Sequence, residues 1–321
     1  MFRKFALAAA FSLTLIPFAF AETPAAPALI LRGPKDNIRA AALSLDGKRL
    51  LATSDDKKLT TWELATGKQL SQFDIPAGSF AVAETADAKH LAIAGGRGPA
   101  QILDAATGKL VKELAKSTNA AAISHDGKIL VTEVLGDPAF NLTIFSLPDG
   151  KTLQGIKLKG GQPTSLSLSK DGQLLAVGLF SGSAENIQII DTKTGQTKSK
   201  LRHTTGMVEV YLADDGATLA SRNVTPDKES IWLWNLKTAT SKPVPNTKES
   251  GQAGAFSPDG KLFLAAAGRG VLKIEVPTAK NDGRIATTKD AAGPNILCFT
   301  PDSKQLLRSQ YNTIELWDTP K

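Results

Sequence analysis

The chain has few of the residues that commonly build catalytic, metal-binding or disulfide-linked sites. Its 321 residues include one cysteine, three histidines, two methionines and two tyrosines. A single cysteine excludes a disulfide within the chain, and no HExxH pattern or Cys/His cluster indicates zinc. Aromatic residues make up only 6%, and the 38 lysines and arginines are scattered rather than clustered. We therefore expect no nucleic-acid partner and no metal or other cofactor.

Long apolar runs are missing after the first 21 residues. At the start, Arg3 and Lys4 precede an apolar run that leads to Ala19-Phe20-Ala21, a pattern typical of a signal-peptide cleavage site. We expect residues 1–21 to be a signal peptide, with an uncleaved anchor as the alternative. Residues 22–321 are then expected to form one domain, periplasmic or secreted after cleavage at about Ala21, without a further segment long enough to span a bilayer. Its 36 basic and 31 acidic residues give a mild positive charge.

The chain instead contains one sequence motif seven times. Each copy has a short apolar run, an Asp-centred turn and a second apolar run, as in "AFSPDGKLFLAAAG". The marker aspartates recur every 39 to 45 residues and are Asp46, Asp87, Asp126, Asp171, Asp215, Asp259 and Asp302. This period is typical of a β-propeller blade. The near-continuous apolar runs predict strands that neighbouring blades cover on both sides.

The sequence therefore predicts an all-β, seven-bladed β-propeller of four-stranded antiparallel blades. The seventh unit ends three residues after Trp317-Asp318 and lacks a fourth strand. The segment "ALILRG", residues 28–33, precedes the first unit and is expected to supply that strand. Closing the ring in this way hides sheet edges that would otherwise pair with other chains.

These repeats resemble the WD40 family over residues 28–321. Trp317-Asp318 matches the family's WD ending, while Trp62-Glu63 and Trp234-Asn235 are near matches. His203 stands at the family's histidine position at the start of a blade. The chain departs from the pattern in its other blades, where the family's His–Ser–Asp–Trp network is not expected. TolB-like exported propellers with "FSPDG" repeats are a neighbouring resemblance. The resemblance implies the fold and says little of activity, because propellers host enzymes, carriers and scaffolds.

The connections between the second and third strands of a blade are expected to vary most. Blades three, four and five each carry three or four extra residues there, which predicts a raised lip. Its candidate partner-binding residues are Leu135, Asp137, Phe140, Phe180, Glu185, Val224, Asp227 and Lys228. Exposed apolar groups within a polar rim indicate an interaction site. The alternative is that the apolar side chains fold back over the blades.

A second candidate site is the mouth of the central channel. Its polar residues are predicted to be Arg39, Asn119, Thr164, Gln252 and Asn295. A purely solvated lining is the alternative. Neither this set nor the three histidines forms a catalytic constellation, since His90 and His125 are expected on the face of uniform turns and His203 stands alone. Cys298, within an apolar run, is expected to be a small buried core residue.

The function predicted from these features is binding rather than catalysis. We expect an exported, monomeric scaffold that binds an unidentified protein or peptide through the lip of blades three to five. The alternative is a small-molecule-binding or hydrolytic propeller, of the lactonase type, with its site at the channel mouth. A purely structural role in the cell envelope is a third possibility.

Overall fold

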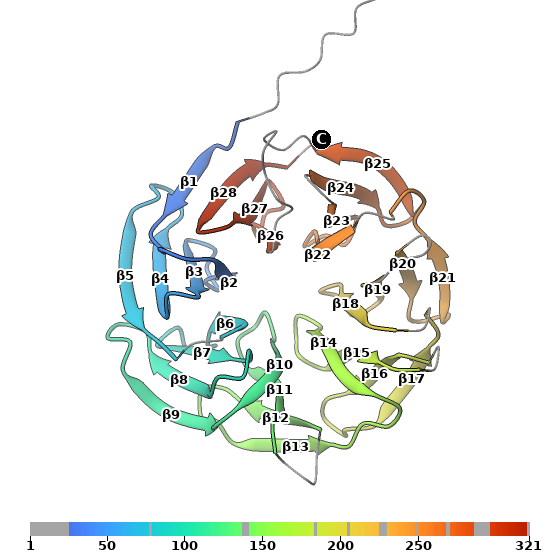
Figure 1. Ribbon diagram of the computed structural model, residues 1–321, viewed down its shortest axis with the longest axis horizontal. Coiled ribbons are helices and arrows are strands. Elements are labelled where there is room, and N and C mark those ends of the chain that lie inside the picture. Colours follow the sequence, from blue (N-terminus) through green and yellow to red (C-terminus); the bar gives the residue numbers. More distant parts are fainter. Residues whose placement is uncertain are drawn as a thin grey trace, which may run out of the picture.

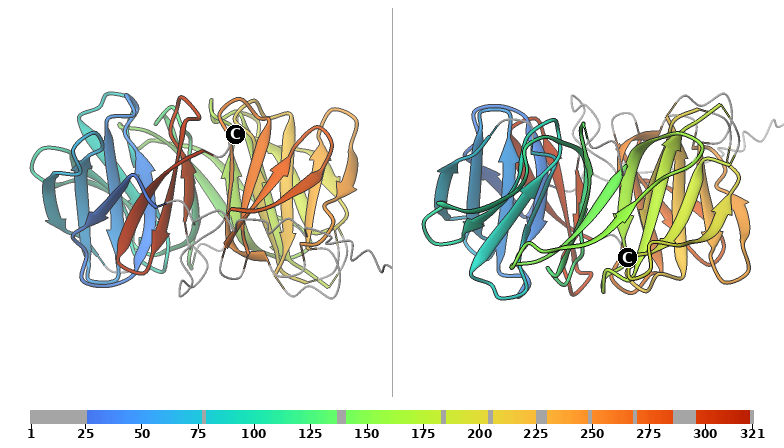
Figure 2. Two further views of the ribbon diagram at one scale, coloured as in Figure 1. Left: turned by 90° about the horizontal axis from the view of Figure 1, so that it is seen from above. Right: turned by 90° about the horizontal axis from the view of Figure 1, so that it is seen from below.

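The computed structural model describes residues 26–76, 79–136, 141–182, 185–203, 206–224, 230–247, 250–267, 270–285 and 296–319. Within this part of the chain, 28 strands form seven four-stranded antiparallel sheets, and there is no helix. The sheets stand around a central axis (Figure 1). Seen from the side, their strands run between the two faces of a disc (Figure 2). The predicted all-β, seven-bladed propeller is confirmed. None of the described segments is a helix that could cross a bilayer.

The strands of each blade follow one another outward from the axis. Blade 1 has β2 (Ile38–Leu43), β3 (Arg49–Ser54), β4 (Lys58–Glu63) and β5 (Gln69–Asp74). Blade 2 has β6 (Ala81–Glu84), β7 (His90–Ala94), β8 (Ala100–Asp104) and β9 (Leu110–Ala115). Blade 3 has β10 (Thr118–Ile123), β11 (Ile129–Val134), β12 (Leu142–Ser146) and β13 (Thr152–Ile156). Blade 4 has β14 (Gln162–Leu168), β15 (Leu174–Phe180), β16 (Ile187–Asp191) and β17 (Thr197–Leu201).

The remaining three blades complete the circle. Blade 5 has β18 (Val208–Leu212), β19 (Thr218–Asn223), β20 (Ile231–Asn235) and β21 (Thr240–Pro243). Blade 6 has β22 (Ser250–Phe256), β23 (Leu262–Ala267), β24 (Gly270–Glu275) and β25 (Lys280–Ile285). Blade 7 has β26 (Leu297–Phe299), β27 (Gln305–Gln310), β28 (Thr313–Asp318) and, on its outside, β1 (Leu29–Arg32).

The marker turns owe their shape to hydrogen bonds of the aspartate side chain. Asp46 Oδ1 accepts bonds from Ser44 Oγ at 2.6 Å and from the backbone N–H of Lys48 at 3.0 Å. A Ser or Thr two residues before the aspartate makes the same bond in five further blades. The residue after the aspartate has positive φ in every blade, even where it is Ala88 or Ser303. These short turns define one face of the disc, the turn face.

The core consists of seven apolar clusters, one between each pair of neighbouring blades. Successive side chains of one strand point to opposite faces of the sheet and therefore pack against different neighbouring blades. In β3, Leu50 packs toward blade 7 while Leu51 packs toward blade 2. This explains the near-continuous apolar runs, because both faces of each sheet are covered. A single blade has no core of its own, so the stability of the ring comes from stacking.

The ring is closed by β1, as the sequence predicted. This strand pairs antiparallel with β28, with Leu29 opposite Leu316 and Arg32 opposite Thr313. Leu31 is only 1% exposed and packs in the cluster between blades 7 and 1. The indole N–H of Trp62, from blade 1, donates to the carbonyl oxygen of Arg32 at 3.2 Å. The closing strand is therefore held by both blades that it joins.

The opposite face carries the connections between second and third strands and the links between blades. We call it the variable face. The three longest second-to-third connections are those of blades 3, 4 and 5, at residues 135–141, 181–186 and 224–230. The corresponding connections of the other four blades have between two and five residues. The predicted difference in loop length is confirmed by the strand bounds.

Candidate functional site

Half of the residues predicted for the lip lie in the described part of the chain. Phe180 is 57% exposed and Leu135 is 40% exposed. Glu185 is also exposed, and Val224 is half-buried. The other four, Asp137, Phe140, Asp227 and Lys228, lie outside the described residues. Phe180 and Leu135 thus present apolar surface to solvent, and their role in binding stays a prediction.

Blades 4 and 5 bring one lip residue next to an apolar residue that the sequence analysis missed. A bridge joins Ser181 to Gly206, and each of these residues is next in sequence to an exposed apolar residue. These neighbours are Phe180 and Met207, which is 39% exposed. The backbone N–H of Val224 donates to the carbonyl of Met207 at 3.0 Å. We call Phe180, Met207 and Val224 the apolar patch.

Exposed large apolar side chains are unevenly distributed over the described surface. Those on the outer strands are Ile30, Leu70, Leu110, Val111 and Leu153. Those on the variable face are Phe80, Leu135, Phe180, Met207 and Tyr311. On the turn face the described part of the chain has only Leu45. Met207 was missed because only second-to-third connections were compared, whereas this residue lies in a link between blades.

A cavity of about 520 Å³ runs along the central channel. Its end at the variable face is lined by Arg39 and Phe80, and its end at the turn face by His125, Lys170 and Asp214. Small side chains of the innermost strands β2, β6 and β22, mostly alanine, line the wall between. A volume of this size is in the range of small-molecule sites.

The residues predicted for the channel mouth have different surroundings. Arg39 lines the cavity, binds both carboxylate oxygens of Asp55 at 2.5 and 2.6 Å, and lies 5.9 Å from the ring centre of Phe80. Asn119 donates its amide to Glu133 at 2.9 Å. The Thr164 hydroxyl is 2.8 Å from the carbonyl oxygen of Val208 and 3.2 Å from that of Gly178. The side chain of Gln252 and all of Asn295 lie outside the described residues.

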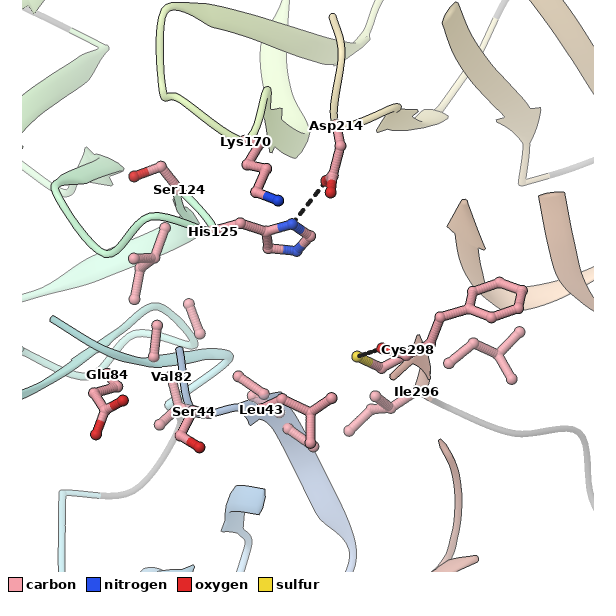
Figure 3. Close-up of a pocket in the computed structure, with 18 of the residues that line it drawn as sticks. Leu43, Ser44, Val82, Glu84, Ser124, His125, Lys170, Asp214, Ile296 and Cys298 are labelled. Carbon is pink, nitrogen blue, oxygen red and sulfur yellow. Dashed lines mark hydrogen bonds and ion pairs between the residues drawn. The ribbon is translucent and has the colours of Figure 1, made fainter. Parts of the chain in front are cut away.

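The end of the cavity at the turn face holds a pair that the sequence analysis did not foresee. His125 Nδ1 lies 2.7 Å from Asp214 Oδ1, and Lys170 stands between the two residues along the ring (Figure 3). Burial raises the pKa of Asp214, but the hydrogen bond from His125 and the charges of His125 and Lys170 outweigh it. The pKa of Asp214 therefore lies below its ordinary value, and the carboxylate is ionised at neutral pH.

Cys298 packs against the core cluster between blades 7 and 1, as predicted, but it is half-buried rather than fully buried. Its side chain is half-buried and lines the cavity, across from His125 (Figure 3). In β26, Leu297 and Phe299 pack between blades 6 and 7, while Cys298 points to the other side of the strand, where it packs toward blade 1 and borders the channel. Burial, and then the charge of Asp214, raises the pKa of this thiol to about 11. At neutral pH it is protonated and a weak nucleophile.

His203, the third histidine, is a structural residue of blade 5. It is 5% exposed and lies with its ring centre 5.7 Å from that of Trp232 and 6.4 Å from that of Trp234. The indole N–H of Trp234 donates to Ser221 Oγ at 2.7 Å. Blade 5 thus retains part of the network that the resemblance implies. Burial lowers the pKa of His203 to about 4.

We expect acid to destabilise the fold through His203. Above pH 6.5 the residue is neutral in both states, whereas between pH 6.5 and about 4 only the unfolded chain takes up the proton. The free energy of unfolding should therefore fall by about 3 kcal/mol across this window. Urea unfolding of wild type and His203→Gln at pH 7 and pH 4.5 measures this fall in the free energy of unfolding. The substitution should remove most of the fall, and an equal fall in both proteins would contradict this.

Comparison with known protein families gives a match to a single repeat. A family model described as WD domain, G-beta repeat matches residues 26–63. This stretch contains the closing strand β1 and the first three strands of blade 1, and it ends at Trp62-Glu63. The comparison with characterised proteins returned no match. The matched repeat and the seven blades agree with the resemblance seen in the sequence.

Proposed function

Because the chain is a WD40-like seven-bladed β-propeller, a fold that commonly serves as a protein-interaction scaffold, we propose that it is exported and binds a protein or peptide through its variable face. The observation that carries the proposal is the distribution of exposed large apolar side chains. Five of the described ones lie on the variable face and one on the turn face. The signal-peptide pattern of residues 1–21 supports export.

The apolar patch is the strongest anchor for such a partner. Phe180 and Met207 offer an aromatic ring and a flexible thioether side by side, and both types are enriched where proteins bind one another. A few such residues commonly carry most of the binding energy. Both are held by the strand framework of blades 4 and 5. We therefore propose a partner segment that inserts apolar side chains against this patch.

Tyr311 gives a second reason to propose the variable face as the binding surface. It is 56% exposed and has a φ of 51° in the turn between β27 and β28. A tyrosine adopts this left-handed conformation only at a cost, whereas asparagine adopts it readily. Backbone strain of this kind is concentrated at functional sites. An exposed aromatic residue in a strained position is accounted for by contact with a partner.

Binding accounts for the described residues better than hydrolysis does. The protonated thiol of Cys298 lies across the cavity from His125. The Ser124 hydroxyl, next to His125 in sequence, donates to Asp126 Oδ1 at 2.7 Å and is engaged in the marker turn. The cavity thus offers His125 no activated nucleophile among its described residues. The enzymatic alternative has no residue constellation to support it there.

Replacing the apolar patch is expected to abolish partner capture without unfolding the protein. A photo-crosslinking amino acid at position 180 or 207 should trap the same protein from a periplasmic extract. Phe180→Ser combined with Met207→Ser should weaken binding of that protein by about 30-fold or more, the scale of an interface hot spot. Leu70→Ser, on the outer strand β5, is the matched control, since Leu70 is 49% exposed.

Tyr311→Asn separates binding from stability. Asparagine relieves the positive φ, so the melting temperature should stay equal or rise while partner affinity falls.

Trapping of unrelated proteins from positions 180 and 207, or equal capture by the patch variant and wild type, would overturn the proposal. A patch variant with a lowered melting temperature would show instead that these side chains cover the blades.

A further inference from the structure

The turn-face end of the channel is a ring of seven equivalent positions. Each is the residue immediately before a marker aspartate, and in blade order they are Leu45, Ala86, His125, Lys170, Asp214, Pro258 and Pro301. Six of the seven line the cavity. Polar chemistry is confined to blades 3, 4 and 5, and the other four positions are apolar. At this end the cavity therefore has one wall with the charged groups of blades 3 to 5 and a mainly apolar wall opposite, where Glu84 is paired with Arg49 (Figure 3).

The charged wall is held in place by backbone hydrogen bonds between blades. The N–H of Asp126 donates to the carbonyl of Lys170 at 3.2 Å, and the N–H of Lys170 donates to the carbonyl of Asp214 at 3.1 Å. The His125–Asp214 contact of 2.7 Å spans blade 4 and fixes the imidazole ring. The Asp214 side chain is only 21% exposed. The His125 side chain is 69% exposed and Lys170 is also exposed, so the His125–Asp214 contact and the backbone bonds, rather than burial, keep the three residues together.

One cation that lines the cavity has no ion pair of its own. Arg39 is paired with Asp55, and Glu84 accepts bonds from Arg49 and from the backbone N–H of Leu45. His125 is paired with Asp214. Among the charged residues that line the described cavity, Lys170 alone has no ion pair. Its ammonium group lies beside the imidazole and points into the cavity (Figure 3).

We propose that this end of the channel binds a small organic anion, a monocarboxylate with an apolar body. Lys170 would hold the carboxylate. The apolar body would lie against Leu43, Ile296 and Cys298 on the opposite wall. Lys170 can hold one carboxylate, whereas the neighbouring ionised Asp214 disfavours a dianion such as a phosphate ester. This site is on the other face from the proposed protein-binding surface and does not depend on it.

Cys298 provides a reporter for the site because it is the only cysteine of the chain. Its side chain is half-buried on the apolar wall. A molecule that fills this end of the cavity must cover the thiol, so alkylation of Cys298 reports occupancy. Because the pKa of the thiol is raised to about 11, the reaction is slow at neutral pH and is best followed at pH 8.5 to 9.

The experiment uses 4-phenylbutyrate as the probe and 4-phenylbutyramide as its neutral counterpart. With purified protein, saturating 4-phenylbutyrate is expected to slow alkylation of Cys298 by iodoacetamide at least tenfold, as followed by mass spectrometry. The amide should give little protection. Calorimetry should show one binding site for the carboxylate. Lys170→Met should weaken its affinity at least tenfold, and Lys170→Arg should retain most of it.

Lys261→Met is the matched control. Lys261 is also a turn-face lysine, its side chain is 77% exposed, and it lies outside the cavity lining. The Lys261→Met variant should bind 4-phenylbutyrate with the affinity of wild type. The variant Phe180→Ser, on the other face, should do the same. The proposal is overturned if millimolar 4-phenylbutyrate neither binds nor protects, if the amide protects equally, or if Lys170→Met binds as well as wild type while its melting temperature is unchanged. If Lys170→Met does not fold, comparison of the acid with the amide in wild type decides the matter.

Discussion

Removing residues 26–33 is expected to lower the free energy of unfolding by about 5 kcal/mol or more, a large part of the stability of an ordinary domain. The deletion takes away the buried side chain of Leu31 and the partner strand of β28. It also leaves the indole N–H of Trp62 without its acceptor, the carbonyl of Arg32. The edge of β28 then faces water or another chain. Chemical denaturation and light scattering measure the loss of stability and the resulting self-association.

Two comparisons show that the strand itself is responsible. Leu31→Ala should cost about 3 kcal/mol because Leu31 is 1% exposed, whereas Ile30→Ala, at a residue that is 42% exposed, should cost under about 1 kcal/mol. A permuted chain that carries residues 26–33 behind residue 319, joined by a short Thr-Gly turn, should regain most of the stability. A deletion variant as stable as wild type would show that the ring does not need its closing strand.

Substituting Glu315 by alanine is expected to cost about 3–5 kcal/mol. Glu315 and Arg308 are 6% and 3% exposed, and Arg308 Nε lies 2.7 Å from Glu315 Oε2. The same oxygen accepts the indole N–H of Trp317 at 2.9 Å, and the guanidinium stacks 4.6 Å from the ring centre of Trp317. Alanine would leave the Arg308 cation buried without its counter-charge. Urea unfolding at pH 7 measures the cost.

The matching control removes both charges. Arg308→Met combined with Glu315→Leu should lose much less stability than Glu315→Ala, because neither residue then leaves a charge uncompensated in the core. Glu315→Gln keeps an acceptor for Trp317 and should fall between wild type and the alanine variant. If Glu315→Ala cost no more than the double variant, the pair would not act as a unit.

The fold was predictable from the sequence because the same turn and the same apolar runs recur in every blade. The marker aspartates set the period, and in six of the seven blades a Ser or Thr two residues earlier fixes the turn by a side-chain hydrogen bond. The apolar runs identify strands covered on both faces, which the seven inter-blade clusters confirm. The missing fourth strand of the last unit identified residues 28–33 as the closing segment, and four of these pair with β28.

The arrangement inside the channel was less predictable. Only the end near Arg39 was considered, and the contact of Cys298 with the cavity was not foreseen because a three-residue strand gives too few positions to show which side borders the channel. The charged wall had a readable signal. Aligning the seven residues before the marker aspartates places His125, Lys170 and Asp214 in three consecutive blades. That these residues face the channel follows from the turn geometry, which one sequence does not reveal.

The junction of β1 with β28 also determines when the molecule can finish folding. The two strands are joined in space but lie at opposite ends of the described chain, at Leu29–Arg32 and Thr313–Asp318. During synthesis the early blades can stack in order, whereas β1 has no neighbour until the last strand has been made. Contacts between such distant segments form slowly because a very long loop must close. The ring of such a chain therefore stays open until its last strand has been made.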